Sequence, residues 1–203
     1  MLQTFSFNPR AGALFARSFA PSDHVPQNER LFYYDPEDDC TNFISQCIWA
    51  SYGGWVPGFT DDIVAKNAQR IKEDMRQVSG VWYGSKSNIG SPKWCRVGEF
   101  FEYITAQKET GPQARLVAEG TFTRVSPASV RAGDVIQMVV ASYTSERYGH
   151  SLYVTKEGAQ WEDVTICCHS FDRLDAPMSV FSQFPDNYKK LRVLHFESAQ
   201  FER

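Results

Sequence analysis

Three residues far apart in the chain carry the side chains of a cysteine-dependent hydrolase: Cys40, His150 and His169. Cys40 follows the acidic, proline-containing loop 34–39 and begins an amphipathic segment, so we expect it at the N-terminus of a helix. The unpaired N–H groups and positive dipole end of such a helix favour a thiolate, the nucleophilic form of cysteine. The position of Cys40 therefore predicts nucleophilic catalysis. The alternative is a buried Cys40 without a chemical role, because free cysteines often pack as small hydrophobic side chains.

The two histidines lie at the ends of predicted strands. His150 begins the strand 149–156, and His169 ends the strand 162–169. In an antiparallel pair the start of one strand lies beside the end of the next, so we expect the two imidazoles to touch near the tip of the Cys40 helix. His150 would be the general base and, as an imidazolium, would hold the thiolate. His169 would fix the tautomer of His150, and the backbone N–H of Cys40 would donate to the oxyanion.

Four other polar residues have weaker claims to a role in the site. Asp172, three residues beyond His169, is an alternative orienting group for the base. His24 lies in a predicted loop and His195 in the last predicted strand, and we assign both to ordinary structural positions. Asp134 follows Ala-Gly and is expected to shape the turn into its strand.

Composition limits the class of protein. The chain has 203 residues, 42% hydrophobic and 22% charged, which predicts a single domain over 1–203. A net charge of −3 without a basic block argues against a nucleic-acid partner, and apolar runs such as 138–141 are too short for a membrane span. The five cysteines form no C-x-x-C pair, so we expect no metal site, no redox dithiol and no cofactor.

The order of the predicted elements indicates the fold class. Asn8 and Pro9 give a helix-start signal, and apolar spacing predicts helices at 9–19, 40–51, 60–78 and 97–104, with a loop over 80–95. Strands are predicted at 116–125, 134–142, 149–156, 162–169 and 190–197. Helices followed by strands with hairpin-length links predict an α+β fold with an antiparallel sheet.

The first twenty residues permit two interpretations. They contain Arg10 and Arg17 but no acid, as in an amphipathic transit peptide. The cap signal at Asn8 and Pro9 favours a helix of the domain instead. Because no secretory apolar region is visible, we expect a cytoplasmic protein or one released by a non-classical route.

The run Asp-Cys-Thr-Asn-Phe-Ile-Ser-Gln-Cys at 39–47 resembles the signature of the bacterial "putative amidase domain" family, which is similar to the NlpC/P60 cysteine peptidases. Further blocks of the chain resemble that family in the same order, at 8–11, 82–83, 91–94, 132–136, 149–151 and 168–173.

This resemblance implies a papain-like (NlpC/P60-like) fold, with N-terminal helices packed on an antiparallel sheet. It implies hydrolysis of amide bonds through a thioester, with cell-wall (peptidoglycan) peptides as the usual substrate of the relatives. Carried over, Cys40 is the nucleophile, His150 the base and His169 the third polar residue. Asp39 resembles an acid that binds a substrate amine in some relatives; its alternative role is to cap the Cys40 helix. The helix at 60–78 resembles no part of the family pattern and is predicted to be an insertion.

Two other functions use the same residues. An acyltransferase would form the same thioester and pass it to an amine or alcohol instead of water. A binding module would keep the fold without turnover, although the intact set of Cys40, His150 and His169 argues against it.

Overall fold

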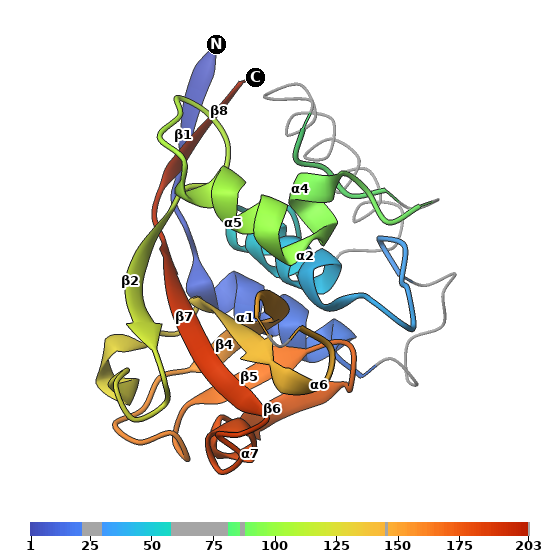
Figure 1. Cartoon of the computed structure of the whole chain (residues 1–203). Helices are drawn as coiled ribbons and strands as arrows, with labels where there is room; N and C mark the ends of the chain where they lie inside the picture. Colours follow the sequence, from blue (N-terminus) through green and yellow to red (C-terminus); the bar gives the residue numbers. More distant parts are fainter. Residues whose placement is uncertain (22–29, 58–80, 86–87, 145, 203) are drawn as a thin grey trace.

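The computed structural model describes residues 1–21, 30–57, 81–85, 88–144 and 146–202 (Figure 1). The predicted helix at 60–78 and His24 lie outside these residues. The helices are α1 (Pro9–Phe19), α2 (Cys40–Ser51), α4 (Pro92–Cys95), α5 (Val97–Thr105), α6 (Ala141–Thr144) and α7 (Ser179–Ser182). The strands are β1 (Leu2–Phe5), β2 (Ala114–Gly120), β3 (Val135–Val140), β4 (Tyr148–Lys156), β5 (Thr165–Cys168), β6 (Arg173–Pro177), β7 (Tyr188–Phe196) and β8 (Ala199–Glu202).

The fold is α+β with an antiparallel sheet, which confirms the fold class predicted from the sequence. Six strands form one sheet in the order β2-β7-β3-β4-β5-β6, and β1 pairs with β8 in a separate ribbon. Figure 1 shows α1, α2, α4 and α5 gathered on one side of the curved sheet, with both termini on the β1–β8 ribbon. Helices α1, α2 and α5 all contact β4, so β4 is the strand on which the helical layer converges. In the part of the chain that the structure describes, no helix is long and apolar enough to cross a bilayer.

Helix α1 begins as the sequence predicts. The side chain of Asn8 accepts hydrogen bonds from the N–H groups of Arg10 (3.1 Å) and Ala11 (3.3 Å), and Pro9 occupies the first helical position.

Helix α2 differs from the amphipathic helix expected at this position, because all twelve of its residues are buried. Its polar side chains are satisfied by neighbouring segments instead of by water. The Asn42 amide donates to the Tyr33 carbonyl (2.8 Å) and accepts from the Trp94 indole (2.6 Å), and the Ser45 hydroxyl donates to the Trp94 carbonyl (2.6 Å). These polar side chains thus bind α2 to α4 and to the loop that precedes α2.

The predicted strands are correct in position but not always in length. Strand β2 ends at Gly120, because Arg124 and Val125 turn back to bond the carbonyl of Thr121. Strands β1, β6 and β8 and the short helix α4 were not predicted. β1 and β6 have mostly exposed or half-buried side chains, so their sequences lack the apolar alternation that marks a half-buried strand.

The sheet has a hydrophobic core on each face. Phe43, Trp49 and Tyr153 belong to the core beneath the helices, whereas Ile136 and Leu152 belong to the core on the opposite face. Neighbouring residues of β4 therefore point to opposite layers, as the period of two requires.

Candidate active site

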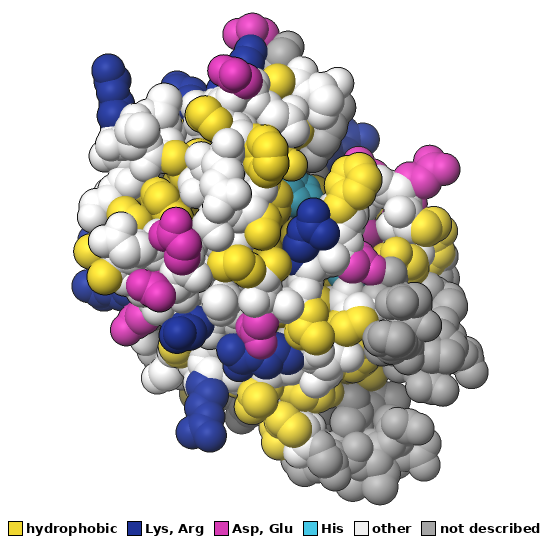
Figure 2. Space-filling model, turned by 90° about the horizontal axis from the view of Figure 1, so that it is seen from below, with side chains coloured by type: hydrophobic (Ala, Val, Ile, Leu, Met, Phe, Trp, Pro, Cys, Tyr) yellow, Lys and Arg dark blue, Asp and Glu magenta, His cyan; other side chains and the backbone are white. Residues whose placement is uncertain are grey.

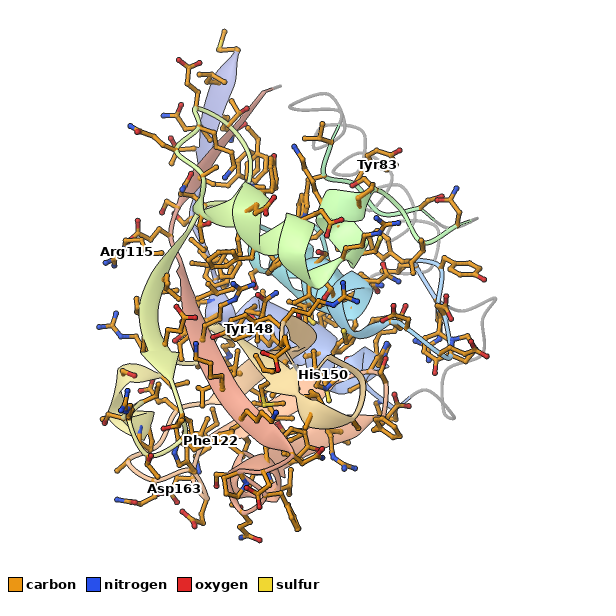
Figure 3. All side chains as sticks on the ribbon, viewed as in Figure 1. Tyr83, Arg115, Phe122, Tyr148, His150 and Asp163 are labelled. Atoms are coloured by element: carbon orange, nitrogen blue, oxygen red, sulfur yellow. The ribbon has the colours of Figure 1, made fainter. Side chains whose placement is uncertain are left out.

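Cys40 is the first residue of α2 and is only 2% exposed. Its side chain lies in the wall of a cavity of about 1120 Å³. His150, Tyr148, Phe171 and Arg192 also line this cavity. The structure therefore brings the predicted nucleophile and the predicted base to one cavity. Figure 3 shows His150 and Tyr148 near the middle of the molecule, where the helical layer meets the sheet.

The wall of the cavity carries charges of both signs. Its acidic residues are Glu37, Asp38, Glu99, Glu102 and Glu146, and its basic residues are Arg96, Arg147 and Arg192. In Figure 2 a histidine surface is visible between hydrophobic and basic side chains on the face shown.

Burial keeps both reactive groups neutral near pH 7. It raises the pKa of the Cys40 thiol to about 11, although hydrogen bonding by Thr41 and by the backbone of Ser151 acts in the opposite direction. Burial, with a smaller effect of the Arg173 charge, lowers the pKa of His150 to about 4. These shifts favour a resting site with a thiol and a neutral imidazole over the expected imidazolium–thiolate pair.

His150 has no orienting partner on one ring nitrogen. Its Nδ1 is buried and has no hydrogen bond to any residue that the structure describes. This nitrogen therefore donates neither to His169, the predicted partner, nor to Asp172, the alternative acceptor. The pairing of β3 with β4 is irregular next to His150, between Met138 and Val139, and such irregularities often lie beside active sites.

His169 instead joins the end of β5 to the start of α2. Its Nδ1 lies 2.5 Å from Oδ2 of Asp39, and its Nε2 lies 2.8 Å from the Phe19 carbonyl. The imidazole also stacks on Phe43, with 4.0 Å between ring centroids. Because both ring nitrogens are occupied, the expected contact of His169 with His150 is wrong.

The register of the sheet explains this correction. Tyr153 pairs with Cys167 across β4 and β5, so continuing the pairing by two residues places His169 beside Ser151. Ser151 faces α2 and bonds Thr41, whereas His150 follows the opposite phase of the strand. The two strand ends do meet as predicted, but a difference of one residue gives the two imidazoles different neighbours: His169 packs on Phe43 of α2, and His150 lines the cavity that Cys40 also lines.

Asp39 has neither of the two roles expected for it, which were to bind a substrate amine and to cap the Cys40 helix. It is 1% exposed, so its carboxylate does not lie on the rim of the cavity. It makes no side-chain capping bond to α2. Its Oδ1 accepts from the backbone N–H of Asp35 (3.1 Å) and from the Asn42 amide (2.6 Å), while Oδ2 meets His169. Asp39 thus holds together the segments that surround the nucleophile.

Asp134 shapes its turn as predicted, since its carboxylate accepts from the N–H of Arg131 (2.8 Å). Nδ1 of His195 lies 2.7 Å from Oδ1 of Asp134, and its Nε2 lies 3.0 Å from Arg131. His195 therefore belongs to this turn, away from the residues that line the cavity.

Four polar residues behind Cys40 were not singled out from the sequence: Thr41, Gln137, Ser151 and Arg192. They form a buried chain of hydrogen bonds that ends at the Cys40 sulfur. One signal was available, because Gln137 interrupts the otherwise apolar strand β3. Within the described ranges, no three histidine, cysteine or acidic side chains are grouped closely enough to hold a metal ion.

The fold and the cavity define an α+β protein with a thiol and an imidazole at one site. The family model described as "Putative amidase domain" matches residues 7–192, and the chain belongs to this family. This confirms membership of the family that the sequence resembles, and the description suggests hydrolysis of amide bonds. No curated protein and no solved structure matches the chain significantly.

Proposed function

We propose that this protein is a cysteine-dependent amidase in which Cys40 is the nucleophile and His150 the general base. One observation carries the proposal: in a chain of an amidase family, Cys40 at the first position of α2 and His150 on β4 line the same cavity. We further propose a papain-like arrangement, in which a helix that begins at the nucleophile packs on an antiparallel sheet, and a single domain over 1–203.

The reaction starts from a neutral pair. As the Cys40 sulfur attacks the amide carbon, the neutral imidazole of His150 takes the thiol proton, so no separate thiolate has to accumulate. The carbonyl oxygen becomes an oxyanion and accepts from the backbone N–H of Cys40, which as a first-turn amide has no partner within its helix. His150 then gives its proton to the leaving amine, and the C–N bond breaks to leave a thioester. Water, deprotonated by His150, hydrolyses the thioester and restores the thiol.

His169 supports this chemistry from a distance. It holds Asp39, the residue before the nucleophile, and thereby sets the position of the first turn of α2. In this proposal His169 is a positioning residue and not the partner of the base that the sequence predicted.

The charges of the cavity suit a peptide that carries both amino and carboxylate groups. Acidic and basic side chains both line the wall, so a substrate of either single sign would meet repulsion. Cell-wall peptides of the peptidoglycan type have this mixed character, which supports them as the substrate class and agrees with the resemblance to NlpC/P60 peptidases. An acyltransferase is the second candidate, because the same thioester accepts an amine if water is excluded.

The experiment incubates the protein with muropeptides and reads the products by mass. Cys40→Ser and Cys40→Ala should abolish cleavage, since neither side chain supplies a thiolate. Cys95→Ala is the matched control, because Cys95 lines the same cavity and should be dispensable. Cleavage that persists without Cys40 would overturn the proposal. Adding a free amine separates the two candidates: a hydrolase gives the free acid, whereas an acyltransferase gives the new amide.

A further inference from the structure

A row of polar side chains crosses the helix-facing side of the sheet behind Cys40. Arg192 of β7 pairs with Gln137 of β3, which pairs with Ser151 of β4. The three side chains point to the same side as Thr41 of α2, and the Gln137, Ser151 and Thr41 side chains are fully buried. This row lies where the sheet otherwise carries apolar residues, so it needs a reason to be polar.

The hydrogen bonds of the row are continuous. Arg192 donates through Nε (2.8 Å) and Nη2 (2.6 Å) to Oε1 of Gln137. Nε2 of Gln137 lies 3.2 Å from the Ser151 hydroxyl and 3.2 Å from the Val97 carbonyl. The Ser151 hydroxyl lies 2.9 Å from the Thr41 hydroxyl, and the Thr41 hydroxyl lies 3.6 Å from the Cys40 sulfur.

Chemistry fixes the direction of the first bonds in this chain. A guanidinium only donates, so Arg192 forces the amide oxygen of Gln137 toward itself and the amide nitrogen toward Ser151. Ser151 therefore accepts from Gln137. Either hydroxyl of the Ser151–Thr41 pair can donate to the other. When Ser151 donates, the Thr41 hydrogen is left for the sulfur, and every bond in the chain then points from the cation toward Cys40.

Arg192 is held firmly at the start of the chain. Its guanidinium carbon lies 3.4 Å from the centre of the Phe101 ring and 4.0 Å from the centre of the Tyr148 ring. Burial lowers its pKa only to about 10, so it is charged at neutral pH. A charged group in this position polarises the hydrogen bonds that follow it.

We propose that Arg192 and Gln137 are positioning residues that direct the hydroxyls of Ser151 and Thr41 onto the Cys40 sulfur and stabilise the thiolate as it forms. This inference rests on the proposed function, because it assigns a task to groups behind the proposed nucleophile. It replaces the imidazolium that the sequence suggested with a guanidinium that acts on the sulfur through the side chains of Gln137, Ser151 and Thr41.

The backbone of Ser151 and of Thr41 also favours the Cys40 thiolate, whereas the other side chains that face Cys40 do not. Asp38, in the loop before α2, disfavours the thiolate through its charge. The Cys168 thiol of β5 lies close to Cys40, and the charge of one thiolate would oppose ionisation of the other. His150 of β4 is neutral near pH 7 and therefore contributes no positive charge. At the far end of the chain, Tyr148 and Glu119 favour the charged form of Arg192.

The test measures the rate at which iodoacetamide alkylates Cys40 in the folded protein as a function of pH, with mass spectrometry to identify the modified cysteine. Gln137→Glu is the informative variant, because a carboxylate of the same shape only accepts. Ser151 would then donate to residue 137, Thr41 would donate to Ser151, and the sulfur would lose its donor. The alkylation profile should move up by about one pH unit, which is a tenfold lower rate at fixed pH.

Thr41→Val removes the last donor at nearly constant size and should give the same shift, while Thr41→Ser keeps the hydroxyl and should restore the wild-type profile. Folded variants with an unchanged profile would overturn the proposal. Unfolding of both Gln137→Glu and Thr41→Val would overturn it as well, because it would assign the row to stability. If cleavage requires Cys40 but the alkylation profiles do not move, only the proposed role of the hydrogen-bond chain from Arg192 to Cys40 is wrong. If cleavage does not require Cys40, the proposed function itself is wrong.

Discussion

Nδ1 of His169 lies 2.5 Å from Oδ2 of Asp39, the residue directly before Cys40, and both side chains are 1% exposed. The other ring nitrogen faces the Phe19 carbonyl, which only accepts, so Nε2 carries a hydrogen. One proton is then held between His169 and Asp39. This buried pair fixes the end of β5 against the first turn of α2, and it sets the position of the nucleophile without touching it.

Asp39→Asn should be tolerated, whereas Asp39→Ala should not. In the asparagine variant the oxygen still accepts from Asp35 and Asn42, and the new amide nitrogen donates to a neutral His169. We expect a loss within about 1 kcal/mol for asparagine and at least about 3 kcal/mol for alanine, which leaves several buried groups unpaired. Urea unfolding measures both, with Asp38→Asn on the neighbouring exposed residue as the control. Equal losses for the two Asp39 variants would contradict this role.

His169→Phe tests the same pair from the other side. Phenylalanine keeps the stacking on Phe43 but leaves the Asp39 carboxylate buried without its proton donor. We expect a loss of about 3–5 kcal/mol, as when one partner of a buried ion pair is removed. Adding Asp39→Asn removes the unpaired charge, so the double variant should be more stable than His169→Phe alone. A purely additive double-mutant cycle would show that the two residues do not interact.

The helices around the site were predictable because their signals are local. Asn8 and Pro9 mark the start of α1, and the acidic loop before Cys40 marks the start of α2, so both bounds agree with the structure. The class of fold followed from the order of the elements. The family resemblance was readable from the run at 39–47, which lies within the matched residues.

The arrangement of the histidines was not predictable, because it depends on the register between β4 and β5. The sequence indicates that His150 begins one strand and His169 ends the next, but a shift of one residue in the pairing of two strands exchanges the faces to which the side chains point. The pairing between these strands shifts near Lys156, and nothing in the local sequence specifies that shift. The partners of Asp39 were hidden for the same reason, since His169 is 130 residues away.

His150 should make the stability of the protein depend on pH between about 4 and 6.5. Its pKa in the folded state is about 4, below the ordinary value of 6.5, so the unfolded chain binds more protons in this window. Stability is therefore complete above pH 6.5 and falls as the pH is lowered. We expect the wild type to lose about 2 kcal/mol more than His150→Gln between pH 7 and pH 5, measured by urea unfolding. Parallel losses in the two proteins would show that His150 titrates normally.

We expect Phe171 to contact the substrate, and its exposed position requires a strained backbone conformation. It is 79% exposed, lines the cavity beside Ser170, and has a positive φ of 73° that L side chains rarely adopt. A large apolar ring held outward in this conformation gains nothing from the fold, so we assign it a contact with the substrate.

Phe171→Gly and Phe171→Ala separate these two effects. Both remove the ring, and burial of such a ring by substrate is worth about 1.5 kcal/mol or more, so KM should rise about tenfold in each. Only glycine relieves the strained φ, so Phe171→Gly should be more stable than Phe171→Ala by up to about 1 kcal/mol. Leu174→Ala is the control, because Leu174 is exposed on β6 and is not among the residues that line the cavity. An unchanged KM in both Phe171 variants would place the substrate elsewhere along the cavity wall.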